Sequence, residues 1–180
     1  MSDTVILVVD MMNTYDHPDA DKLIPHVEQI IDPLSRLVGE ASEREDVDLV
    51  YVNDNYGDFS AGFGDIVASA LDGQRPDLVK PIVPHHGLRV MTKVRHSAFY
   101  ATSLAYLLNQ LQPERLVLTG QVTEQCILYT ALDAYVRHFP VVIPRDAVAS
   151  IDPALGDAAL QMMARNMSAE ILDSAAGCLL

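Results

Sequence analysis

The stretch RLVLTGQVTEQC, residues 115–126, combines a strand, a turn and the start of a helix. Its first five residues are mostly apolar or β-branched, as in a strand that is covered on both faces. Gly120 ends this run, and from Thr123, a predicted N-cap, apolar residues recur at helical spacing as far as His138. Cys126 would then lie in the first helical turn, where the positive end of the helix favours a thiolate. We therefore expect a nucleophile at Cys126, although free cysteines often only fill the core.

Five further segments resemble buried strands, and helical patterns lie between them. The strands are predicted at Val5–Val9, Asp48–Asn53, Arg89–Lys93, Phe139–Pro144 and Ala169–Leu172. The helices are predicted at Leu23–Glu43, Tyr100–Leu111, Thr123–His138 and Pro153–Asn166. This alternation predicts a three-layer α/β/α fold, with a mostly parallel six-stranded sheet and helices on both of its faces. A length of 180 residues suits one domain that spans residues 1–180.

Composition and charge exclude several classes of partner. The formal net charge is −13 and the sequence has no run of Lys or Arg, which argues against binding to nucleic acid or to an anionic membrane. The apolar run Val5–Val9 is too short for a secretory signal or a membrane span, so we expect a cytoplasmic protein. Cys178 is far from Cys126 in the sequence, which does not suggest a disulfide framework, and we expect it to pack.

Three polar residues lie at the ends of predicted strands. Asp10 follows the first strand, Lys93 ends the third, and Cys126 lies just beyond the fourth. Ligands of parallel sheets bind beyond the carboxyl ends of the strands, so we expect these three side chains to converge there. Each residue alone is a weak signal, because an Asp after a strand is often a turn former and a single Lys is often a solvated charge.

Two long stretches are expected to be irregular, and loops of this length are often covers of functional sites. They are residues Asp54–Gly64, which are rich in Gly and aromatic residues, and residues Gly73–Gly87, which are rich in Pro. Phe59 and Phe63 lie among glycines in the first stretch and suggest a mobile flap.

Three motifs, in order, resemble those of the isochorismatase-like cysteine hydrolases, the superfamily that includes nicotinamidases and N-carbamoylsarcosine amidases. They are VVDMMNTY at residues 8–15, KVRHSAF at residues 93–99 and TGQVTEQC at residues 119–126, followed by DAVAS at residues 146–150. The similarity spans about residues 5–152. It implies a Rossmann-like strand order 3-2-1-4-5-6 and a homodimer or homotetramer.

The resemblance also implies a catalytic triad of Cys126, Asp10 and Lys93. Asp10 would take the thiol proton and pass it to the leaving group, while Lys93 would hold the carboxylate and favour the thiolate. Attack by the sulfur would give an oxyanion and then a thioester that water hydrolyses. In the family the oxyanion donors are the backbone amides at the positions of Val122 and Cys126, and the bond between the residues matching Gln121 and Val122 is cis.

Six further residues are candidates for contact with substrate, from family position or from their place at a strand end. They are Tyr15, Asn53, Asp54, Tyr56, Phe99 and Thr123. The aromatic residues among them could equally belong to the core, and Asn53 and Asp54 could merely shape the exit from their strand.

The sequence departs from the family's metal-dependent members, the nicotinamidases, which hold a metal through an Asp-x-His segment and a further His. The matching stretch here, residues Asn53–Asp58, has no histidine, and the adjacent His85 and His86 lie in a Pro-flanked loop typical of a surface. We therefore predict no metal and no other cofactor. The predicted substrate is a small amide, carbamoyl or related carbonyl compound.

Two alternatives remain open. The isochorismatases proper generally lack the cysteine and cleave a vinyl ether, so Asp10 and Lys93 could act while Cys126 is idle. The chain could also be a catalytically silent protein that binds a small ligand. Unusually fast alkylation of Cys126 would argue against the silent protein.

Overall fold

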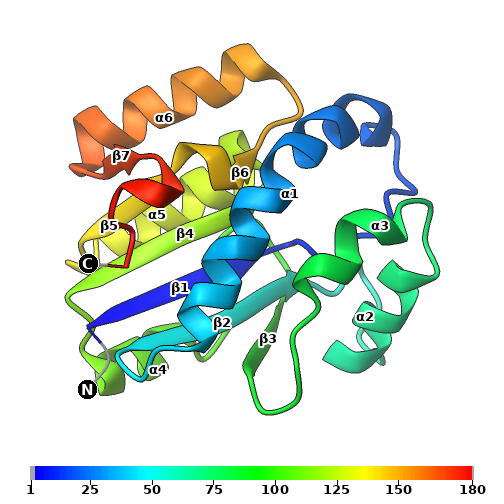
Figure 1. The fold of residues 1–180 in the computed structure, drawn as a ribbon, viewed down its shortest axis with the longest axis horizontal. Helices are drawn as coiled ribbons and strands as arrows, with labels where there is room; N and C mark the ends of the chain where they lie inside the picture. Colours follow the sequence, from blue (N-terminus) through cyan, green and yellow to red (C-terminus); the bar gives the residue numbers. More distant parts are fainter. Residues whose placement is uncertain (1–2, 180) are drawn as a thin grey trace.

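The computed structural model describes residues 3–179, which form a parallel seven-stranded sheet between two layers of helices (Figure 1). The strands are β1 (Thr4–Val9), β2 (Val47–Asp54), β3 (Arg89–Lys93), β4 (Arg115–Gln121), β5 (Val141–Pro144), β6 (Val148–Ala149) and β7 (Glu170–Leu172). Their order is β3-β2-β1-β4-β5-β7, and β6 pairs with β4. The predicted order of six strands is confirmed, with β7 as the sixth. Strand β6 was missed because two residues are too few to show a period.

Four of the helices correspond to the predicted ones, with shifted ends. The helices are α1 (Ala20–Ser42), α2 (Phe63–Leu71), α3 (Pro76–Val79), α4 (Leu104–Leu111), α5 (Leu128–Tyr135) and α6 (Pro153–Met167). Short helical segments are the 3₁₀ turns η1 (Lys80–Ile82), η3 (Arg145–Ala147) and η4 (Ser174–Ala176), and the π-helix η2 (Thr123–Ile127). Pro153 occupies the start of α6 as predicted, and the Asp152 carboxylate accepts hydrogen bonds from the amides of the first turn.

The predicted irregular stretches and the predicted helix from Tyr100 need correction. Phe63 begins α2 instead of belonging to a flap, and α3 with η1 lies inside the stretch Gly73–Gly87. The helix predicted from Tyr100 begins only at Leu104, because Ala101 has a φ of 55°, which is incompatible with a right-handed helix. Phe59 does lie in an irregular loop and is 82% exposed.

Strand β1 lies at the centre of the sheet and is buried over its whole length. Ile6 and Val8 point into the core beneath α1, whereas Val5, Leu7 and Val9 point into the core beneath α4, α5 and α6. This alternation follows from the two-residue period of a strand. A continuous apolar run is therefore required here, because both faces of β1 are covered.

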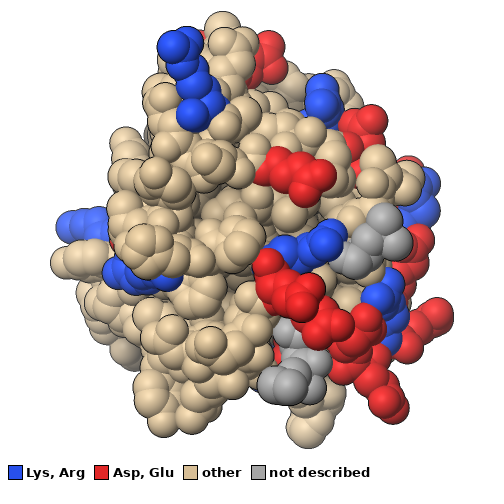
Figure 2. Space-filling model, turned by 90° about the vertical axis from the view of Figure 1, so that its left-hand side faces the viewer, with Lys and Arg blue, Asp and Glu red and all other residues tan. Residues whose placement is uncertain are grey.

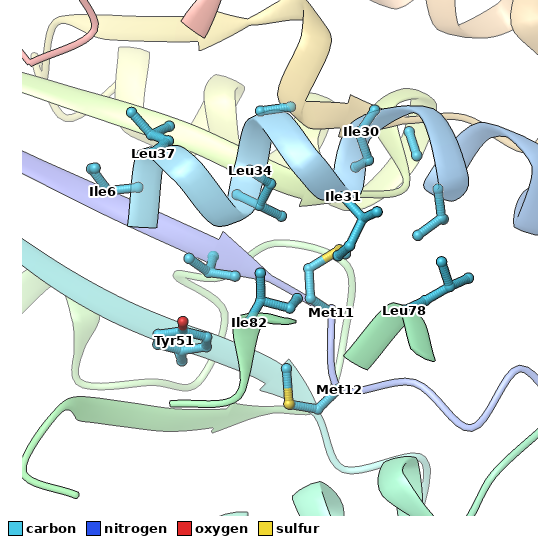
Figure 3. Close-up of a cluster of buried hydrophobic side chains, with 14 of the residues drawn as sticks. Ile6, Met11, Met12, Ile30, Ile31, Leu34, Leu37, Tyr51, Leu78 and Ile82 are labelled. Atoms are coloured by element: carbon cyan, nitrogen blue, oxygen red, sulfur yellow. The ribbon is translucent and has the colours of Figure 1, made fainter. Parts of the chain in front are cut away.

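Helix α1 covers one face of the sheet with an apolar stripe (Figure 3). Leu34 and Leu37 are at most 2% exposed and pack against the core that contains Ile6 and Tyr51. At the carboxyl end of β1 the same core contains Met11 and Met12, which follow the strand and are also buried. The residues that follow β1 are thus held firmly by apolar packing beneath α1.

The side of the molecule where the parallel strands begin differs in its surface charges and neighbouring helices from the side where they end. The chain enters β1 on the first of these sides, and Figure 2 shows the molecule from there. Lys and Arg side chains occur there singly, and acidic side chains gather on one part of the face (Figure 2). The opposite side, which holds the carboxyl ends of β1, β2, β3 and β4, lies near α2 and α3. Across residues 3–179, no helix is both long and apolar enough to cross a membrane.

Candidate active site

The structure brings Asp10, Lys93 and Cys126 together at the carboxyl ends of the strands. Nζ of Lys93 lies 2.8 Å from Oδ2 of Asp10 and 3.6 Å from Sγ of Cys126. The Asp10 carboxylate and the Cys126 thiol are close enough that each shifts the pKa of the other. Lys93 is 1% exposed, and Asp10 and Cys126 are 7% exposed. An acid, a cation and a thiol therefore share one largely dry site, in which their charges interact strongly.

Neighbouring strands position the Asp10 carboxylate. The Asp10 backbone turns sharply out of β1 with a φ of 53°, and its N–H donates to the carbonyl of Val52. Oδ1 of Asp10 accepts a hydrogen bond of 2.7 Å from the amide of Asp54, at the end of β2. The side-chain amide of Gln121 donates to the Asp10 carbonyl over 2.8 Å. The carboxylate is thereby held by β2 on one oxygen and by Lys93 on the other.

Gly120 lets β4 approach β1 closely beside the site. Its φ is 104°, a conformation that favours glycine, and a Cβ built there would lie 2.1 Å from the carbonyl oxygen of Val9. The next peptide bond but one, between Gln121 and Val122, is cis, as the family resemblance implied. The backbone amide of Val122 lies close enough to the sulfur of Cys126 to lower the pKa of the thiol.

The helix that carries Cys126 begins differently from the prediction. The cap residue is Val122, whose backbone is extended, and Thr123 is already the first residue of η2 without a capping hydrogen bond from its side chain. Thr123 was therefore wrongly assigned as the N-cap. The amide of Ile127 donates to the carbonyl of Val122 over 3.2 Å, a five-residue spacing that widens the first turn into a π-helix.

Burial and the neighbouring charges keep the free site in its protonated thiol form. Burial, followed by the negative charge of Asp10, raises the pKa of Cys126 to about 12, although Lys93 opposes this shift. The expectation that the helix end would favour a thiolate is thus wrong for the free site, because these two effects outweigh it. Burial also raises the pKa of Asp10, against the attraction of Lys93. Burial alone would lower the pKa of Lys93, but its negative neighbours, Asp10 first, raise it.

A cavity of about 540 Å³ reaches the reactive groups from solvent. Asp10, Val122 and Cys126 line it, so the thiol is accessible to a small molecule. Asp54 and Tyr56 also line this cavity, as candidates for contact with substrate should. The Tyr56 hydroxyl donates to the carbonyl of Met12 over 3.1 Å, which fixes the ring beside the cavity.

The other four candidates for substrate contact lie elsewhere. Tyr15 is fully buried beneath α1, and Phe99 is 5% exposed in the opposite core, where its ring stacks on Phe139. Neither ring lines the cavity beside Cys126. Both belong to the hydrophobic core, which was the alternative left open for these aromatic residues. Asn53 is buried and bonds to both the N–H and the C=O of Met12, so it shapes the backbone around the site. Thr123 is buried too, and it borders a separate cavity of about 390 Å³.

Several residues near the cysteine were not identified from the sequence. Nδ1 of His96 lies 3.9 Å from Sγ of Cys126, and the imidazole stacks on Tyr129. Asp16, His17 and Asp19 line the cavity from the loop between β1 and α1. His96 lies inside the quoted motif at residues 93–99, and the other three follow the motif at residues 8–15 directly. Proximity to a motif was therefore the available signal, but no periodicity distinguishes these residues from solvated ones.

The structure does not assemble a metal site from its usual ligands. Within residues 3–179 no three His, Cys, Asp or Glu side chains are grouped so that they could hold a metal ion. His85 and His86 are both exposed. The absence of a cofactor in the working protein stays a prediction.

Comparison with known proteins identifies the family. The Isochorismatase domain model matches residues 4–176. An uncharacterized isochorismatase family protein of Bacillus subtilis, YaaI, is 33% identical over 170 residues, which cover 94% of this chain and 93% of that protein. The N-carbamoylsarcosine amidase structure from Thermoplasma acidophilum has a TM-score of 0.71 and 28% identity, with 97% of each chain covered.

A similar fold occurs in an isochorismatase-like hydrolase from Alkaliphilus metalliredigens. Its crystal structure has a TM-score of 0.80, covers 98% of both chains and is 24% identical, so this likeness concerns the fold alone. The match of the domain model to nearly the whole chain and the similarity to YaaI agree with each other. The chain belongs to the isochorismatase family of hydrolases.

Proposed function

We propose that this protein is a cysteine hydrolase that cleaves the C–N bond of a small amide or carbamoyl compound through a thioester on Cys126. The observation that carries the proposal is the 3.6 Å contact between Lys93 and Cys126, beside Asp10 and at the wall of a cavity. Further support comes from the similarity to an N-carbamoylsarcosine amidase, whose name specifies hydrolysis of an amide-type bond.

Proton transfer from the thiol to Asp10 would begin the reaction. In the free site the negative charge is on Asp10, 2.8 Å from the ammonium of Lys93. After transfer the negative charge is on the sulfur, 3.6 Å from the same ammonium. The lysine thus keeps an ionic partner in both states, so the thiolate forms without an unpaired charge in a buried site. The raised pKa of Asp10 makes it a better base for this step.

Attack of the thiolate on the substrate carbonyl would form a C–S bond and an oxyanion. We assign the oxyanion to the backbone amides of Val122 and Cys126, because the amide of Val122 is close enough to the sulfur to lower the pKa of the thiol, and Val122 and Cys126 both line the cavity. Collapse breaks the C–N bond, and Asp10 returns its proton to the leaving nitrogen. Water, deprotonated by Asp10, then hydrolyses the thioester to a carboxylic acid (or carbamic acid) and the free thiol.

Intact-protein mass spectrometry after rapid acid quenching tests this proposal. The protein is mixed with a panel of small amides and carbamoyl compounds, and a substrate should leave an acyl adduct on Cys126. The Cys126→Ala variant should form no adduct and should lose hydrolysis by at least about 10³-fold. Cys178→Ala is the matched control, because Cys178 is buried near the C-terminus and does not line the cavity.

Full activity of the Cys126→Ala variant would contradict the proposal. That result would favour the alternative in which Asp10 and Lys93 cleave a vinyl ether while the cysteine is idle. A complete lack of adduct and of turnover, together with an ordinary alkylation rate of Cys126, would favour the catalytically silent homologue.

A further inference from the structure

The cavity that reaches Cys126 is lined by charges of one sign. Asp10, Asp16, Asp19 and Asp54 line it, and no Lys or Arg of the described chain does so. Carboxylates in a concave, partly dry surface reinforce one another, because the low dielectric of the walls focuses their field. The charge of this cavity therefore bears on which ligand it can bind.

Nearby cations offset these carboxylates only in part. Lys93 lies behind the cavity wall with a fully buried side chain, and its single charge is shared between Asp10 at 2.8 Å and Asp54 at 3.5 Å. Lys22 pairs with Asp19 at 3.0 Å, but its side chain is 68% exposed and the pair is open to solvent. The four carboxylates thus have only two lysines as ionic partners, and neither lysine lines the cavity.

Asp16 is the carboxylate that has no cation. Its Oδ1 accepts a hydrogen bond of 3.1 Å from the neutral amide of Gln74, and within residues 3–179 it forms no ion pair. Asp16 is also exposed, so it can meet a ligand that enters the cavity. A charge of this kind beside a cavity favours a positive group on the ligand.

His17 adds an unpartnered polar nitrogen to the same wall. It lines the cavity, and its Nε2 is buried without a hydrogen-bond partner in the described protein. An unprotonated imidazole nitrogen can accept a hydrogen bond from an N–H group. Asp16, His17 and Asp19 come from the one loop between β1 and α1, so a single segment carries both the negative charge and this unpartnered nitrogen.

We propose that the substrate of this site is an amide that also carries an ammonium or guanidinium group, which Asp16 and Asp19 recognise. This inference rests on the hydrolase function proposed above. A carboxylate on the substrate would instead meet four carboxylates without the Arg or Lys that usually binds such a group. The cavity therefore selects against acidic amides as well as for basic ones.

Three amides of almost equal size test the charge preference. They are β-alaninamide with an ammonium group, butanamide with a methyl group in its place, and succinamate with a carboxylate. We expect kcat/KM to fall in that order, by roughly tenfold at each step at low ionic strength, and the differences to shrink with added salt. Succinamate cleaved as well as β-alaninamide would overturn the inference.

Charge variants connect the preference to the named residues. The double substitution Asp16→Asn and Asp19→Asn should lower the ratio of kcat/KM for β-alaninamide to that for succinamate by at least about tenfold. Asp21→Asn is the matched control. Asp21 lies in the first turn of α1, two residues after Asp19, but it does not line the cavity. An unchanged ratio in the double variant, or an equal change in the control, would overturn the assignment to Asp16 and Asp19.

Alkylation of Cys126 tests the charge without requiring turnover. Iodoacetamide and iodoacetate have similar size but differ in charge, and their rates can be normalised to those with 2-mercaptoethanol. The normalised rate of iodoacetate at Cys126 should be at least about tenfold lower, and it should rise in the double variant. Equal normalised rates would overturn the charge inference. If the rates differ as expected while no amide is cleaved and no acyl adduct forms, the hydrolase proposal fails and the charge of the cavity stands.

Discussion

Lys93 and Asp10 form an ion pair of 2.8 Å in which the lysine side chain is fully buried and the aspartate side chain is 10% exposed. The two residues are 83 positions apart, and their contact joins the end of β3 to the end of β1 although β2 lies between these strands. A buried pair of this kind is costly to break from one side, since the remaining charge loses its partner. The pair therefore matters for stability as well as for the proposed chemistry.

Removal of Lys93 alone should destabilise the protein strongly. In Lys93→Met the Asp10 carboxylate stays buried without a cation, so we expect the free energy of unfolding to fall by about 3 kcal/mol or more. Urea unfolding followed by circular dichroism measures this change. The double variant Lys93→Met with Asp10→Asn should be less destabilised than the sum of the two single variants. Additive effects would mean that the pair contributes no coupling.

Gly120 should tolerate an added methyl group poorly, because β4 and β1 approach each other closely there. Gly120→Ala places a Cβ against the carbonyl of Val9 at a φ of 104°, so we expect a loss of about 3 kcal/mol in the free energy of unfolding. Gly64→Ala is the control, because nothing lies within 4 Å of its added Cβ and the residue lies in α2. That variant should be unchanged or stabilised by up to about 1 kcal/mol. Similar losses in both variants would argue against the close approach of β1 and β4.

The raised pKa of Cys126 should make stability depend on alkaline pH. The folded thiol titrates near pH 12 and an ordinary thiol near pH 9, so its contribution is fully present below pH 9 and is lost as pH rises through 12. Between pH 8 and pH 10 the wild type should therefore lose about 1 kcal/mol more than Cys126→Ala does. Urea midpoints at pH 8, 9 and 10 measure this difference. Parallel pH dependences of the two proteins would be evidence against a raised pKa.

Substitution of Asp10 should affect hydrolysis and alkylation in opposite directions. Asp10→Asn removes the proposed base, so hydrolysis should fall by about 10² to 10⁴-fold. Burial is the largest cause of the raised pKa of Cys126, and the negative charge of Asp10 is the second. The same change removes this charge. The rate of iodoacetamide alkylation at neutral pH should therefore rise. Rates of both reactions can be measured on one preparation, and a parallel fall in both would mean that Asp10 also deprotonates the thiol for alkylation.

Much of the fold was predictable because its signals are local. The apolar run of β1 is continuous and the apolar stripe of α1 is periodic over many residues, so both elements were found with ends shifted by at most three residues. Strand β6 has two residues and α3 has four, which is too short for a period to appear. Helix α2 was missed because glycines and a preceding irregular loop obscured its pattern.

The candidate site was predictable only in outline. Asp10, Lys93 and Cys126 were expected to meet because parallel strands end at a common edge. The placements of Tyr15 and Phe99 were not decided by their motifs, since an aromatic ring suits either a core or a cavity wall. The contact between His96 and Cys126 depends on how the chain leaves β3, which no local pattern specifies.

The sequence by itself determined the alternation of strands and helices, the strand order through its family motifs, and the identity of the residues that end on one edge. These features depend on periodicity and on chain direction, and both can be obtained from the linear order of the residues. Only the tertiary structure decided that Cys126 rests as a thiol and that four carboxylates line the cavity beside it. Burial and Coulomb interactions act through space, so they depend on distances between residues that the linear order does not contain.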